Sequence, residues 1–185
     1  MSNLAFIVDG QMEQLIIGNI CPNKPIRLLN CNGRDVSIEA AAKRAASLIR
    51  LMRRNYPIII IFDREKRVES SKTICEVFLS AIRQNGIQDV HLIIGVPDRM
   101  MENWMLADIQ SINTYYGISV TQTSFEGKGG KGHLRKLIEP KNYQETEDGP
   151  EIAKRVNIAV AKSNSESLDD FLVKIAEMGC SYSSN

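Results

Sequence analysis

The chain has 185 residues, a formal net charge of +1 and 43% hydrophobic residues. This length is enough for one domain with a sizeable core, and the composition is that of a globular protein, which excludes a disordered chain. Because the net charge is close to zero, any attraction to nucleic acid has to come from local patches.

Cysteine and histidine metal sites are nearly excluded. The four cysteines form no CxxC pair, and there are only two histidines. The first residues lack the basic start and apolar centre of a signal peptide, and no run approaches the roughly twenty apolar residues of a membrane span. We therefore expect a cytoplasmic protein that does not enter a membrane.

Strands and helices alternate along the first half of the chain. Apolar runs predict strands at 4–8, 26–31, 58–62 and 90–96, and amphipathic patterns predict helices at 11–20, 37–55 and 68–84. The run Ile-Ile-Ile-Ile-Phe at 58–62 is typical of a strand buried on both faces of a parallel sheet. The alternation predicts an α/β fold: a mostly parallel open sheet of about four strands with helices on both faces.

The pattern changes after Pro97. It predicts a helix at 102–108, a flexible glycine-rich loop at 127–132, a polar connector at 140–150, and closing helices at 151–161 and 165–178. We expect a single domain over 1–185. Its core would cover about 1–118, and a loop with a helical C-terminal extension would cover about 119–185.

Acidic side chains follow predicted strands or begin predicted helices. Asp9 and Glu13 follow the first strand, Asp63 and Glu65 follow the strand at 58–62, and Glu102 begins a helix. Each acid alone is equally well explained as a helix cap. Together they can meet at the carboxyl edge of the sheet, where they would repel one another unless a cation neutralised them. The set therefore predicts a Mg²⁺ or Mn²⁺ site suited to phosphodiester chemistry.

Two motifs resemble the TOPRIM fold, the metal-binding domain of topoisomerases, primases and the overcoming-lysogenisation-defect nucleases. Residues 7–13, Ile-Val-Asp-Gly-Gln-Met-Glu, look like the family's Val-Glu-Gly-x-x-Glu start, and residues 62–65, Phe-Asp-Arg-Glu, look like its Asp-x-Asp element. Asp9 replaces the usual Glu, and Glu65 replaces the usual second Asp. These departures either compensate, which leaves a metal site of shifted geometry, or mark a domain that has lost catalysis.

The resemblance is closer to a family of small TOPRIM-like bacterial proteins, and it spans nearly the whole chain. Its most specific part is the segment 102–108, Glu-Asn-Trp-Met-Leu-Ala-Asp, which is similar to that family's Glu-x-Trp-Leu-Leu-Ala-Asp helix. A lysine-containing segment at 131–136 and a Ser-x-Ser element leading to an aromatic residue at 163–171 follow in the family's order.

The resemblance implies a Mg²⁺- or Mn²⁺-dependent nuclease that hydrolyses DNA or RNA. Asp63, Glu65 and Asp9 would hold the metal, while Asp9, Glu13 and Glu102 would be the catalytic groups. It also implies a role in mobile-element or phage defence with an ATPase partner. The sequence leaves open whether the chain forms a homo-oligomer.

A basic segment lies in and after the glycine-rich stretch. Lys128, Lys131, Arg135 and Lys136 are candidates for contacts with nucleic-acid phosphates, and a solvated loop explains them equally well. The spacing is not that of a P-loop. His133 would be a general base if the loop closed over the acids.

Three further residues have expected positions. We expect Trp104 to pack its helix onto the sheet, Arg64 to point away from the acids and pair with a carboxylate or phosphate, and Asp108 to lie at a helix bend.

Two other functions fit the same residues. One is a non-catalytic TOPRIM-like module that binds nucleic acid or a partner ATPase, which the substituted motif positions favour. The other is a flavodoxin-like receiver domain phosphorylated on Asp63, although the paired acids that receivers carry after their first strand are missing.

Overall fold

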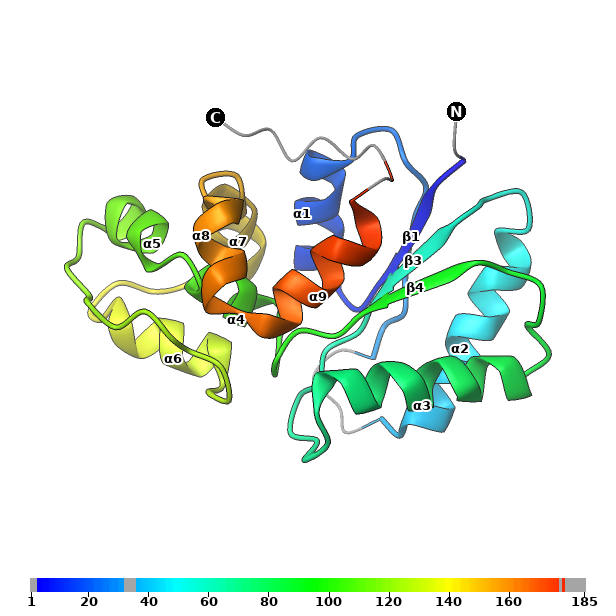
Figure 1. Ribbon diagram of the computed structural model, residues 1–185. Coiled ribbons are helices and arrows are strands. Elements are labelled where there is room, and N and C mark those ends of the chain that lie inside the picture. The colour runs from blue at the N-terminus through cyan, green and yellow to red at the C-terminus, as the bar shows by residue number, and fades with distance from the viewer. Residues whose placement is uncertain (1–2, 32–35, 177, 179–185) are drawn as a thin grey trace.

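The computed structural model describes residues 3–31, 36–176 and 178 (Figure 1). In chain order it contains β1 (Ala5–Val8), α1 (Gln11–Ile20), β2 (Ile26–Leu28), α2 (Ile38–Leu51), β3 (Ile58–Ile61), α3 (Ser71–Gln84), β4 (Leu92–Gly95), α4 (Met101–Leu106), α5 (Ile109–Tyr116), α6 (Gly130–Leu137), α7 (Glu145–Ala153), α8 (Ile158–Asn164) and α9 (Glu166–Ile175). None of the helices within these ranges is long and apolar enough to cross a membrane.

The four strands form one open sheet in the order β2-β1-β3-β4, and every neighbouring pair is parallel. In the register, Ile7 on β1 lies beside Ile60 on β3, which lies beside Ile94 on β4. The predicted parallel sheet is therefore confirmed. All its strands have their carboxyl ends at one edge, which is where the acidic residues follow.

Helices cover both faces of the sheet, as predicted (Figure 1). Side chains alternate between faces along a strand, so Ile59 and Ile61 pack with α1, α4 and α9, while Ile58 and Ile60 pack with α2 and α3. Each of these four side chains is at most 1% exposed. The unbroken isoleucine run thus follows from burial on both sides.

Serine caps set the start of the two helices on the second face. Ser37 accepts a hydrogen bond from the Ala40 N–H at 3.2 Å before α2, and Ser70 accepts one from Thr73 at 3.1 Å before α3. The expected helices at 37–55 and 68–84 are present with shorter bounds.

The C-terminal part is helical, but the positions of its helices correct the sequence analysis. The stretch 127–132 is not all loop, because α6 begins at Gly130. A Cβ on Gly130 would lie 2.5 Å from the Asn103 side-chain oxygen, so glycine there permits α6 to pack closely on α4. Packing outweighs the low helix propensity of glycine.

Two further expectations for this part were wrong. The connector at 140–150 contains the first turns of α7, and the helix expected at 151–161 is divided between α7 and α8. The helix expected to start within 102–108 is likewise divided, into α4 and α5. A Cβ on Gly149 would lie 2.7 Å from Met12 Sδ, which shows how closely α7 packs on α1. Residues from this extension, such as Phe125 and Phe171, belong to the same core cluster as β1 and β3.

Candidate functional site

The carboxyl edge of the sheet borders a cavity of about 450 Å³. Its walls come from the β1–α1 turn, the residues after β2 and β3, and the first turns of α4, α6 and α7. The lining residues are Asp9, Gly10, Gln11, Met12, Glu13, Leu28, Asn30, Asp63, Glu65, Met100, Glu102, Lys131, Glu145 and Thr146. All the acids that the sequence analysis placed at the sheet edge therefore meet around one cavity.

Backbone N–H groups position the first two carboxylates. Asp9 directly follows β1, and its Oδ1 accepts a hydrogen bond from the Cys31 N–H at 2.9 Å, beyond the end of β2. Glu13 lies in the first turn of α1 and accepts one from the Gly10 N–H at 3.0 Å. Both side chains are 6% exposed. Burial is the main reason that the pKa of each is raised.

Asp63 is the second residue beyond the end of β3, after the buried Phe62. Its side chain is 8% exposed, and its Oδ1 has no hydrogen-bond partner among the described residues. Burial raises the pKa of Asp63 well above its usual range, and the negative charges of Glu13, Glu102, Asp9 and Glu65 raise it further. The ionised form of Asp63 is therefore disfavoured both by burial and by the four neighbouring carboxylates.

Glu65 has a left-handed backbone conformation, with φ at 56°, which non-glycine residues seldom adopt. Its N–H donates to the Arg99 carbonyl at 2.6 Å, which ties the loop after β3 to the loop after β4. Between the two acids, Arg64 forms an ion pair with Asp98. Arg64 does not line the cavity, so it points away from the acids as expected. Strained backbone of this kind is typical of functional loops.

Glu102 is the most deeply buried acid of the cavity, at 1% exposure in the first turn of α4. Its Oε1 has no hydrogen-bond partner within the described part of the chain. Burial raises the pKa of Glu102 from 4.5 to about 7, although the ammonium of Lys131 opposes the shift. Glu102 thus exchanges its proton near neutral pH.

The charges around the cavity are far from balanced. Among the described lining residues there are six carboxylates and one ammonium, so full ionisation would leave five negative charges uncompensated. The ammonium is Lys131, and its Nζ already lies 2.7 Å from Glu145. Buried charges that lack counter-charges are costly. Full ionisation of these carboxyl groups is therefore unfavourable unless a positive charge is supplied, in agreement with their raised pKa values.

The donors suit a hard divalent cation, because they are oxygen atoms of carboxylates. As the side chains stand, however, no three His, Cys, Asp or Glu residues of the described chain are close enough together to hold a metal ion. A cation held by these carboxylates would therefore require their side chains to come closer together.

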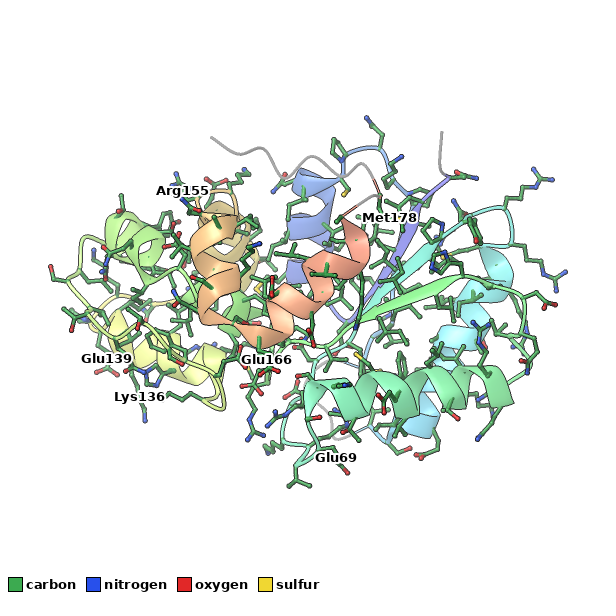
Figure 2. The ribbon with its side chains drawn as sticks, viewed as in Figure 1. Glu69, Lys136, Glu139, Arg155, Glu166 and Met178 are labelled. Atoms are coloured by element: carbon green, nitrogen blue, oxygen red, sulfur yellow. The ribbon has the colours of Figure 1, made fainter. Side chains whose placement is uncertain are left out.

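The basic segment is only partly at the cavity. Lys131 lines it, while Arg135 lies 3.2 Å from Glu145. Lys128 lies over the ring of Phe125, and Lys136 is exposed on α6 (Figure 2). Of the four predicted phosphate contacts, the structure therefore brings Lys131 to the acids directly, and the others lie nearby on α6 and the loop before it.

His133 does not line the cavity. Its ring packs edge-on against Phe125, with 5.2 Å between the centroids, and burial lowers its pKa. The ring thus contributes to packing at the position where a general base had been expected.

Trp104 and Asp108 have structural roles. Trp104 stacks on Phe171 at 5.1 Å, and its Nε1 donates to Ser167 Oγ at 2.9 Å. It therefore packs α4 against α9, whereas contact with the sheet had been expected. Asp108 precedes α5 and accepts a hydrogen bond from the Asn157 N–H at 2.8 Å. It therefore joins the helix bend to the start of α8.

Glu145 is the lining acid that the sequence analysis missed. It lies in the first turn of α7, inside the stretch expected to be a connector. Its position depends on the packing of α7 against α1, for which the sequence carries no local signal.

Known protein families, curated proteins and solved structures include no match to this chain. The likeness to TOPRIM domains thus rests on the sequence motifs alone, with the segment 102–108 as the most specific of them, and remains a prediction.

Proposed function

We propose that the protein is a Mg²⁺- or Mn²⁺-dependent TOPRIM-like nuclease that hydrolyses phosphodiester bonds of DNA or RNA. The observation that carries the proposal is the ring of six carboxylates and one ammonium around a single cavity at the carboxyl edge of a parallel sheet. Open α/β sheets bind their ligands at this edge. A substrate phosphate adds negative charge, so the cavity can accept one only together with a cation.

Asp63, Glu65 and Asp9 are the proposed metal ligands. The unpartnered Oδ1 of Asp63 supports this role, because a buried carboxylate oxygen without a donor is available to a cation. When bound, the metal would polarise a phosphate and lower the pKa of a water molecule.

Glu13 and Glu102 are the proposed groups beside the reacting phosphate. Glu102, whose pKa is about 7, can accept or release a proton near neutral pH, as general acid–base catalysis requires. Glu13 is held by its hydrogen bond to the start of α1. Lys131 can contact a phosphate oxygen once its ion pair with Glu145 is broken. Lys128, Arg135 and Lys136 would contact flanking phosphates.

A second candidate is a non-catalytic TOPRIM-like module that binds nucleic acid or an ATPase partner. The spacing of the carboxylates favours it, because no three potential ligands among the described residues are close enough together to hold a metal ion. Defence against phages or mobile elements with such an ATPase is part of the same proposal.

Calorimetric titration of Mn²⁺ separates the two candidates. We expect saturable binding to the wild-type protein and its loss in Asp63→Asn, which removes the central charge at constant shape. Asp89→Asn is the matched control, because Asp89 is exposed and precedes β4 at the opposite edge of the sheet. Binding that survives in Asp63→Asn would contradict the assigned ligand.

Cleavage is then measured with labelled DNA and RNA, in Mn²⁺ and in excess chelator. We expect cleavage in Mn²⁺ by the wild-type protein and by Asp89→Asn, and none by Asp63→Asn. Failure of Mn²⁺ to bind even in the presence of a non-cleavable oligonucleotide would rule out the nuclease and leave the binding module.

A further inference from the structure

The outer edge of β4 is a prominent feature of the fold that the proposed site does not use. β4 is the last strand of the sheet and runs between α9 and α3 (Figure 1). The carbonyl groups of His91 and Gly95 point inward and accept hydrogen bonds from the N–H groups of Ile58 and Phe62, each at 3.0 Å. Because successive residues of a strand point their backbone groups in opposite directions, those of Leu92 and Ile94 point outward. An edge with outward-pointing backbone groups of this kind can pair with another strand.

The outward carbonyl of Ile94 has long contacts in the described part of the chain. Cys75 Sγ and Lys174 Nζ each lie 3.5 Å from it. For a nitrogen donor this is beyond the usual range of about 2.7–3.2 Å. A backbone N–H from a strand outside β4 would satisfy this carbonyl better.

An open groove of about 660 Å³ follows the edge, with β4 as its floor and α3 and α9 as its walls. Leu79 on α3 and Val173 on α9 line it, and Val173 is 71% exposed. Exposed apolar side chains beside an unpaired strand mark a surface suited to contact with protein.

The charged residues of the groove are ordered so that the surface complements itself. From the carboxyl end of β4 towards its amino end, α3 carries Lys72 and then Glu76, and α9 carries Asp170 and then Lys174. All four side chains are exposed, and none forms an ion pair with another described residue. In an antiparallel second copy the order is reversed. Lys72 then meets Glu76 of the other copy, and Asp170 meets its Lys174.

We propose that a second copy of this chain docks antiparallel on the β4 edge, so that two four-stranded sheets continue into each other across a two-fold axis. An interface of this symmetry uses the same patch on both copies, so each residue pair occurs twice. The alternating order on both α3 and α9 meets this requirement. The proposal does not depend on the nuclease assignment.

Sedimentation velocity of the full chain over a range of concentrations tests the dimer. We expect the wild-type protein to show a monomer–dimer equilibrium. Asp170→Lys brings like charges together twice and should raise the dimer Kd about tenfold or more, and Lys174→Asp should do the same. Glu139→Lys, an exposed change at the far end of the molecule, should leave the Kd unaltered (Figure 2).

Mixing the two variants provides the sharper test. In a heterodimer of Asp170→Lys with Lys174→Asp, each introduced charge meets its opposite, so the Kd should return to within about twofold of the wild-type value. A wild-type protein that stays monomeric at every concentration overturns the proposal, and so does a dimer that neither variant weakens. Equal thermal unfolding of all variants, measured at a concentration at which each is monomeric, establishes that charge, and not folding, is the cause.

Discussion

Glu102→Gln is expected to stabilise the metal-free protein at alkaline pH. The folded chain holds the Glu102 proton up to about pH 7, whereas the unfolded chain releases it near 4.5. Between these two values the folded state binds more protons, so the free energy of unfolding falls as the pH rises. A tenfold difference in proton affinity corresponds to about 1.4 kcal/mol, so the wild-type protein loses about 3 kcal/mol by about pH 8. Glutamine stays neutral and avoids the loss.

Urea denaturation with chelator present measures the effect. At about pH 8 we expect Glu102→Gln to exceed the wild-type protein by up to about 3 kcal/mol, and at about pH 4.5 by less than about 0.5 kcal/mol. Glu69→Gln, at an exposed position before α3, is the control and should change little at either pH. A gain of equal size at both pH values, or a loss at pH 8, would refute the reasoning. Saturating Mn²⁺ should then stabilise the wild-type protein more than the variant.

Two packing predictions follow from the helices that close the sheet. Gly95→Ala places a Cβ 2.5 Å from the ring of Phe171, so we expect the free energy of unfolding, measured by thermal unfolding, to fall by about 1–3 kcal/mol. Gly132→Ala is the control: its Cβ meets open space in α6, so the variant should be unchanged or up to about 1 kcal/mol more stable. Ser167→Ala removes the acceptor for Trp104 Nε1 and for a backbone N–H, and should cost about 1–3 kcal/mol in urea denaturation; an unchanged midpoint would show that another acceptor replaces it.

The sheet and its acidic edge could be predicted because both are local properties of the chain. The unbroken apolar run at 58–62 predicts that β3 is buried, and Asp63 comes directly after this run. Once the strands are parallel, residues that follow different strands must meet at the same edge. The convergence of Asp9 with Asp63 around one cavity follows from those two facts.

The closure of the cavity could not be predicted in the same way. The glycines around Gly130 and the proline at Pro150 have low helix propensity, so the sequence argues against helices at these positions. The helices α6 and α7 form there nevertheless, because their packing compensates for the low propensity. The contact that holds the segment before α7, from Tyr143 Oη to Met12 Sδ, joins residues 131 positions apart.

The sequence by itself therefore determined the parallel sheet and the acids at its carboxyl edge, since strand pattern and strand ends are short-range features. Only the tertiary structure decided that Glu145 and Lys131 complete the cavity and that Glu102 is buried enough for its pKa to reach about 7. Burial and charge balance depend on which distant segments pack together, and no local pattern encodes that.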